Sequence, residues 1–266
     1  MICRNHLYSA LVVVGFANGA SERIVNSIDS QTTTVAILDM FGVSLVAWGA
    51  LAVAVCLLLR SQGQPVRRMD FVVSGMASIV FLLPVPQFSW VALSAIAIYL
   101  LITSPAGPMR RAASVLGALT IPMLWARLGF AAFSEPILAI DAKLVSWIVG
   151  TNSDANVIPF ADGSGRVFLE PACSSLTNVS LALLCGVAIV KLYDLPWSAT
   201  VVRVVLAACL ATVVINVVRI SAIAVLPGHY DLIHGPVGLT VAEWTTNLAV
   251  AAIFALGLRP DVQAYV

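Results

Sequence analysis

The sequence predicts an all-α protein of the polytopic membrane class, built as a bundle of about eight transmembrane helices. Hydrophobic residues make up 60% of the 266 residues and charged residues only 10%, whereas an ordinary globular domain is about a quarter charged. The mean hydropathy of +0.99 agrees with this composition. The net charge of +1 offers no basic surface for a polyanion, so nucleic-acid binding is excluded as a function.

Eight apolar runs are the candidate spans, and several are short enough to require bilayer thinning, tilt or paired re-entry. In chain order, the runs cover residues 7–19, 35–59, 71–85, 88–103, 112–133, 173–190, 199–226 and 239–258. The first run follows Arg4 and precedes small and polar residues, so it also has the pattern of a signal-peptide core. We expect one integral-membrane domain over residues 1–266, with N-terminal spans in 1–133, an extracytoplasmic loop in 134–172 and core spans in 173–258.

The basic residues predict the orientation, because loops rich in Lys and Arg stay in the cytoplasm. With both termini inside, the cytoplasmic segments hold Arg4, Arg60, Arg67, Arg68, Arg110, Arg111, Lys191, Arg203 and Arg259. Arg23, Lys143 and Arg166 then lie outside, and Arg127 and Arg219 fall within spans. The opposite orientation would place the larger group of cations outside.

The longest segment between spans, residues 134–172, is extracytoplasmic in this topology. Residues 136–149 carry Asp141 and Lys143 on an otherwise apolar sequence, which predicts an interfacial helix. Residues 151–165 are rich in Asn, Asp, Ser and Gly, which is typical of a loop or hairpin. Loops of this length are often functional lids or binding loops, and the alternative is a plain connector.

Cys173 opens an apolar run at the predicted outer face. Pro171 stands where a helix takes its first residue, so we expect Cys173 in the first helical turn. The unpaired amides of such a turn favour the thiolate, which is the nucleophilic form, and can hold the oxyanion of a tetrahedral intermediate. The alternative is a small buried hydrophobe, which we assign to Cys56, Cys185 and Cys209. The five cysteines include no Cys-x-x-Cys pair, so we expect no disulfide framework.

Arg219 lies within a predicted span, where a charge costs about 2.5 kcal/mol or more and therefore normally faces the bundle interior. In a functional interpretation it stabilises the Cys173 thiolate, an oxyanion or a substrate carboxylate. The alternative is a structural ion pair with Glu243. Asn216 lies one turn earlier on the same helical face and is a candidate to orient Arg219 or to donate to the oxyanion.

Arg127 is the second cation within a predicted span. One interpretation places it along a substrate groove. The alternatives are that its side chain extends to the membrane interface or pairs with Glu135.

His229 and His234 share the outer loop before the last span. An imidazole gains and loses a proton near neutral pH, which suits removal of a thiol proton and its delivery to a leaving amine. We select His234, because it directly precedes the glycine-flanked start of the last span. Cys173 with both histidines has an unusual spacing for zinc and no second cysteine, so we expect no metal or organic cofactor. Ser164 lies between glycines but lacks the Gly-x-Ser-x-Gly spacing of a serine hydrolase.

The motifs around these residues resemble the exosortase/archaeosortase family of membrane cysteine transpeptidases. They read Ala-Cys-Ser at residues 172–174, Asn-x-x-Arg-Ile at 216–220 and His-Gly at 234–235, followed by Gly238. The resemblance covers the chain from Glu170 to Leu258, and the earlier spans match only as a hydrophobic multi-pass block. Ser175 stands where the family often has Gly, and Leu239 where it often has an aromatic residue.

By this resemblance Cys173 is the nucleophile, Arg219 the essential cation and His234 the third catalytic residue. A histidine at the third position is similar to the bacterial branch, which implies the bacterial cytoplasmic (inner) membrane with the site on the periplasmic or extracytoplasmic face. The implied substrates are membrane-anchored proteins with a C-terminal sorting tail. Their cleavage would form a thioester that a lipid, a glycan or water resolves. The alternative class is a non-catalytic scaffold or a transporter component, although no internal repeat of the transporter kind is visible.

Overall fold

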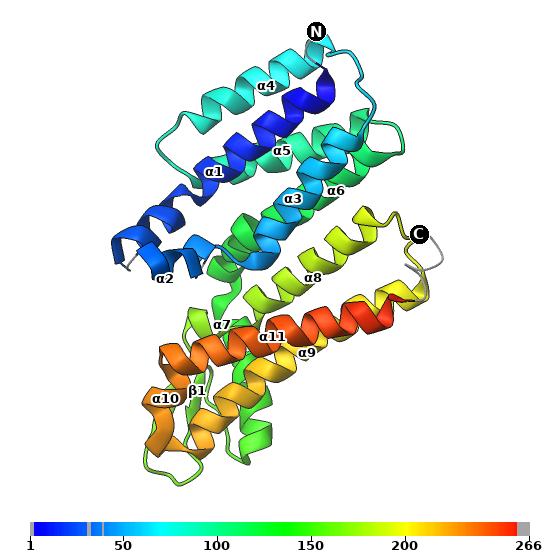
Figure 1. Ribbon diagram of the computed structural model, residues 1–266. Helices are drawn as coiled ribbons and strands as arrows, with labels where there is room; N and C mark the ends of the chain where they lie inside the picture. The colour runs from blue at the N-terminus through cyan, green and yellow to red at the C-terminus, as the bar shows by residue number, and fades with distance from the viewer. Residues whose placement is uncertain (1–2, 31–32, 39, 260–266) are drawn as a thin grey trace. The chain divides into compact units, whose positions relative to one another are not determined.

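The computed structural model describes residues 3–30, 33–38 and 40–259 and consists almost entirely of helices (Figure 1). The strands of this part of the chain form one short hairpin. Four of its helical segments are long and apolar enough to cross a membrane: Pro108–Val149, Ser175–Leu192, Ala199–Val225 and Val237–Gly257. The all-α prediction is therefore confirmed, and the total of about eight spans stays a prediction.

The chain divides into two compact units, and each is described by itself. The first unit comprises Met1–Trp125 and Leu184–Pro196, and the second comprises Ala126–Leu183 and Trp197–Val266. The single domain expected over residues 1–266 stays a prediction.

The first unit is a bundle of helices. Its elements are α1 (Arg4–Ser30), α2 (Thr33–Leu38), the 3₁₀ turn η1 (Met40–Gly42), α3 (Leu45–Arg60), α4 (Arg68–Phe81), α5 (Gln87–Thr103), α6 (Pro108–Thr120), the π turn η2 (Ile121–Trp125) and the second half of α8 (Ser175–Leu192).

Helix α1 continues well beyond residue 19, where the first apolar run ends. Its buried side chains recur at helical spacing from Tyr8 through Leu11, Val12 and Phe16 to Ala20, and Ser27 is buried beyond them. Gly15 allows α1 to approach its neighbours closely, because a Cβ atom there would lie 2.6 Å from Phe81 Cζ. Packing against the bundle therefore sustains the helix through a segment that the sequence pattern assigned to an outer loop.

The apolar run 35–59 is divided in the structure, although the sequence predicts one span there. Phe41 and Gly42 have positive φ angles of 58° and 68°, which no helix continues through. Ser44 then caps the start of α3, because its Oγ accepts a hydrogen bond from Ala47 N over 3.2 Å. The turn and the cap together fix the break.

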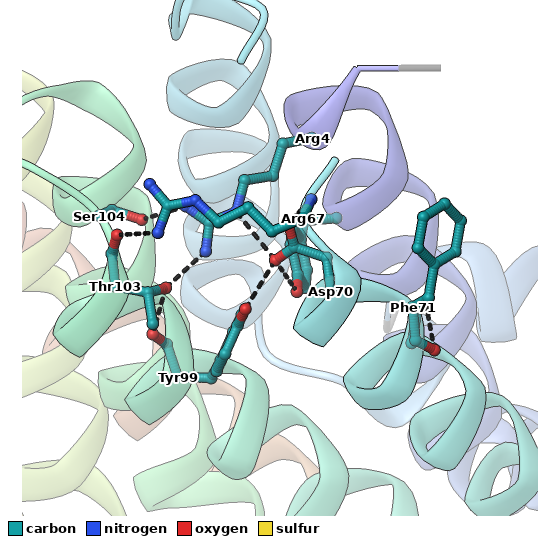
Figure 2. A network of polar contacts seen from close by, with 9 residues as sticks. Arg4, Arg67, Asp70, Phe71, Tyr99, Thr103 and Ser104 are labelled. Atoms are coloured by element: carbon teal, nitrogen blue, oxygen red, sulfur yellow. Dashed lines mark hydrogen bonds and ion pairs between the residues drawn. The ribbon is translucent and has the colours of Figure 1, made fainter. Parts of the chain in front are cut away.

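A buried ion pair joins α1 to α4 in the first unit (Figure 2). Arg4 Nε donates to Asp70 Oδ1 over 3.0 Å, and neither side chain has any exposed surface. The hydroxyls of Tyr8 and Tyr99 donate to the same carboxylate oxygen, each over 2.9 Å. Arg4 also donates to two hydroxyls at the end of α5, those of Thr103 and Ser104. Both buried charges are therefore compensated within the unit.

Replacing Asp70 by Ala is expected to destabilise the protein by about 3–5 kcal/mol, because it leaves the buried Arg4 charge without its counter-charge. Thermal unfolding of the detergent-purified full chain would measure this loss. Asp29→Ala is the matched control, since Asp29 is an exposed aspartate of α1. Equal unfolding temperatures for the two variants would contradict a stabilising role for the network.

The second unit holds the residues that the sequence singles out for chemistry. Its elements are α7 (Ala126–Val149), β1 (Val157–Pro159), β2 (Arg166–Phe168), the 3₁₀ turn η3 (Pro171–Cys173), the first half of α8, α9 (Ala199–Val225), the 3₁₀ turn η4 (Pro227–His229), α10 (Tyr230–His234) and α11 (Pro236–Gly257). Helix α11 lies antiparallel along α9 (Figure 1).

The extracytoplasmic segment predicted at 134–172 is ordered into a helix and a hairpin. Helix α7 contains the helix predicted at 136–149 and is bent at Phe133, whose φ and ψ are −129° and 29°. Pro136, which cannot donate a backbone hydrogen bond, lies three positions after the bend. The hairpin alternative for the polar segment is confirmed, because β1 pairs antiparallel with β2.

Candidate active site

Cys173 ends a 3₁₀ turn and precedes helix α8. Pro171 is the first residue of that turn, and Ser174 is extended (φ −70°, ψ 140°), so α8 begins only at Ser175. Pro171 and Cys173 thus lie in one helical turn, as the sequence predicts, but this turn is separated from α8 by the extended Ser174. Cys173 is only 7% exposed and belongs to an apolar cluster formed with α7, the two strands and α9.

The backbone amides around Cys173 already have acceptors. Cys173 N donates to Glu170 O over 2.9 Å and Ser174 N to Pro171 O over 3.2 Å, which are the bonds of the 3₁₀ turn. Ser175 N donates to Asp141 Oδ2 over 3.0 Å. The expectation that unpaired amides at this point hold an oxyanion is therefore wrong for these three residues, because each amide is engaged.

Asn216 connects α9 to the cysteine segment, which comprises residues 173–175. Its Nδ2 donates to the carbonyl oxygen of Cys173 over 2.7 Å and to Ser175 Oγ over 3.1 Å, and the side chain is 5% exposed. The two hydrogens of the amide group are thereby used. Asn216 fixes the Cys173 backbone, and it has no hydrogen left for the oxyanion that the sequence analysis considered.

Arg219 follows Asn216 by one turn of α9 and is half-buried. Its Nε is a buried atom that forms no hydrogen bond in the described part of the chain. The ion pairs that the structure shows among its described residues do not include Arg219, and the alternative pair with Glu243 stays a prediction. A buried donor nitrogen of a cation is thus available beside the Asn216 anchor.

His234 ends the short helix α10. Its ring stacks on Tyr230, with the centroids 4.9 Å apart and the planes 13° apart. Tyr230 and Ile233 of the same helix pack against the apolar cluster that contains Cys173. A tight corner follows, because a Cβ atom at Gly238 would lie 2.1 Å from Ile233 O. His229 is exposed at the start of α10.

The structure brings the predicted site residues together to different degrees. Asn216 contacts the Cys173 segment directly, Arg219 lies one turn further along α9, and His234 lies on a helix packed against the same cluster. Within the described residues no hydrogen bond joins Cys173 Sγ to Arg219 or His234. The catalytic roles of Cys173, Arg219 and His234 stay predictions.

Arg127 and Glu243 are the other two residues expected to support the site, and both are exposed. Arg127 is exposed and lies 14 positions before Asp141, which is about 20 Å along α7. In the described chain it forms no ion pair with Glu135, which is also exposed. Glu243 is exposed on α11. None of these three residues is shown to contact the Cys173 segment.

Ser164 lies in the exposed turn of the β hairpin. Its N–H and hydroxyl both donate to Asp162 Oδ1, over 2.9 and 2.6 Å, and these bonds hold the pKa of the Asp162 carboxyl below its usual value. The serine thus stabilises a turn. Over residues 3–30, 33–38 and 40–259, no three His, Cys, Asp or Glu side chains are grouped to hold a metal ion.

Asp141 is the site residue that the sequence analysis did not identify. It is 4% exposed on α7 and accepts the Ser175 amide 34 positions later in the chain. The available signal was an acidic residue in an otherwise apolar helix, since such a residue needs a buried donor. The sequence gives no indication of which donor that is.

The protein is all-α, and some of its helices are long and apolar enough to cross a membrane. Comparison with known proteins adds no closer assignment, because no family model, no curated protein and no solved structure matches the chain significantly.

Replacing Asn216 by Ala is expected to destabilise the second unit by about 1–3 kcal/mol, because the buried Cys173 carbonyl and Ser175 hydroxyl lose their donor. Chemical unfolding in detergent would measure the loss, with Asn247→Ala as the control at an exposed asparagine of α11. The anchor would be refuted by equal stabilities of the two variants.

A Gly238→Ala variant is expected to lose about 1–3 kcal/mol and to displace α10, because its Cβ atom would overlap Ile233 O. Gly228→Ala is the control in the same loop, since a Cβ atom there meets nothing within 4 Å. Proteolysis rates at the α10–α11 corner and unfolding temperatures would measure both changes. An unchanged Gly238→Ala variant would show that the corner can relax.

Proposed function

We propose that this protein is an integral-membrane cysteine peptidase or transpeptidase, similar to the exosortases, that cleaves the C-terminal sorting tails of exported proteins. The observation that carries the proposal is the pair of hydrogen bonds from Asn216 to the Cys173 carbonyl and the Ser175 hydroxyl. These bonds tie the cysteine segment to the helix that carries Arg219 one turn later. A thiol and a cation are thereby held in one part of the second unit, as a cysteine nucleophile requires.

The proposed reaction begins when the Cys173 thiol gives its proton to His234. The sulfur attacks the scissile carbonyl carbon, a sulfur–carbon bond forms, and the carbonyl oxygen becomes negatively charged. The carbon–nitrogen bond then breaks, and His234 returns the proton to the leaving amine. A hydroxyl or amine of a lipid or glycan acceptor resolves the thioester in a transfer, and water resolves it in a hydrolysis.

Arg219 is the donor that we assign to the oxyanion. The amides of Cys173, Ser174 and Ser175 have acceptors, and the Asn216 amide group uses its two hydrogens. Arg219 Nε is buried and without a hydrogen-bond partner in the described chain. A cation that gains its partner only when charge develops stabilises the transition state more than the substrate.

The proposed setting is the bacterial inner membrane, with Cys173 at its extracytoplasmic face. The distribution of Lys and Arg supports this orientation, and the long apolar helices support several crossings. A sorting tail that itself spans the bilayer would present its cleavage motif at the same face. The proposed reaction requires an acceptor or water but no metal or organic cofactor.

A second candidate is a non-catalytic scaffold. It is favoured by the burial of Cys173, which is 7% exposed and lies in an apolar cluster. In this role Cys173 is a small packing residue. The peptidase proposal instead requires that this part of the protein opens enough to expose the thiol at the outer face.

Thiol labelling from outside the membrane distinguishes the two candidates. The full chain with Cys173 as its only cysteine is expressed in bacteria, and spheroplasts are treated with a membrane-impermeant alkylating reagent over a range of pH. We expect labelling at Cys173, with a pH midpoint that rises in Arg219→Ala and His234→Ala, because both residues favour the thiolate. Mass spectrometry of the labelled peptide measures the extent.

The matched control is the chain with Cys185 as its only cysteine, since Cys185 lies within α8 and is expected to resist the reagent. Cys173 labelling that is absent, or that is insensitive to both substitutions, would favour the scaffold.

A further inference from the structure

A buried carboxylate fixes the position at which helix α8 begins. Asp141 is 4% exposed, and its Oδ2 accepts the N–H of Ser175, the first residue of α8, over 3.0 Å. Its neighbours on α7, Leu138, Ala142 and Val145, belong to the cluster that contains Cys173. A carboxylate in such surroundings is stabilised by the amides and the dipole at a helix N-terminus.

The cysteine segment is therefore held from two sides. Asn216 of α9 binds the carbonyl of Cys173, and Asp141 of α7 binds the N–H of Ser175. The two peptide groups that flank Ser174 are thus anchored to different helices, and the extended conformation of Ser174 is set between them. A rigid backbone at this point fixes the position of the Cys173 Cα atom, from which the side chain extends.

We infer that Asp141 is a positioning residue of the Cys173 site, because its carboxyl group anchors the Ser175 amide, two positions after the residue that carries the thiol. This inference rests on the proposed function of Cys173 as a nucleophile. The amide at the start of α8 is thereby occupied by the Asp141 carboxyl group. A negative charge on this group would disfavour a second one on the Cys173 sulfur, and Arg219 would then offset it when the nucleophile forms.

The other charged or titratable groups on the cysteine segment and on the elements packed around it are less buried than Asp141. They are Arg127, Glu135, Lys143, Arg166, Glu170, Arg203, Arg219, Tyr230, Asp231 and His234. Arg219, Tyr230 and His234 are half-buried, and the others are exposed, so solvent screens them more strongly.

The test uses the detergent-purified full chain with Cys173 as its only cysteine. Asp141→Asn keeps an oxygen acceptor for Ser175 N and removes the charge, whereas Asp141→Ala removes both. Asp154→Asn is the control, because Asp154 is an exposed aspartate between α7 and β1. Two quantities are measured: the pH midpoint of Cys173 alkylation by iodoacetamide, and hydrogen exchange of the Ser175 amide.

We expect the midpoint to fall by about one pH unit in Asp141→Asn and to stay unchanged in Asp154→Asn. Exchange at Ser175 is expected to rise about tenfold in Asp141→Ala and to change little in Asp141→Asn. A purely structural cap would leave the Asp141→Asn midpoint at the wild-type value, which would overturn the inference. A midpoint that depends on Asp141 but not on Arg219 or His234 would instead count against the proposed reaction. Cys173 that reacts only in denatured protein would overturn both.

Discussion

The structure depends on one constraint: a chain with few charges, built for an apolar environment, has to pair its buried polar groups internally. Each unit satisfies this constraint around one aspartate. In the first unit Asp70 accepts hydrogen bonds from Arg4 and two tyrosines. In the second unit Asp141 accepts the amide of Ser175. These contacts join helices that are distant in the sequence, so they determine which helix ends lie together.

Much of the fold is predictable from the sequence, because helical propensity and hydrophobic runs are local properties. The helices α5, α9 and α11, the helix at 136–149 and the hairpin all follow from such patterns. The continuation of α1 to Ser30 does not, since it depends on packing against other helices. The break at Phe41 and Gly42 was also missed, because an apolar run hides a turn when only one glycine marks it.

The candidate site shows the same division between local and long-range information. The sequence identifies Cys173, Arg219 and Asn216 as notable residues, and the structure connects Asn216 to the Cys173 backbone. The sequence could not show that Asp141 occupies the Ser175 amide, because the two residues are 34 positions apart. The sequence pattern therefore predicts that the amides near Cys173 bind an oxyanion, whereas in the structure these amides already have acceptors. The sequence leaves open whether Cys173 is buried, because the residues that cover it come from α7, α9 and the strands.

The Arg4 network described in the first unit has a consequence for the order of folding during synthesis. The partners of Arg4 lie 66 to 100 positions later in the chain, in α4 and at the end of α5. Helix α1 is synthesised before α4 and α5, so its basic end has no buried counter-charge until Asp70 has been made. Contacts of such long sequence separation form slowly. Helix α1 therefore reaches its final packing only after α5 has been made, and until then the Arg4 guanidinium has to remain hydrated.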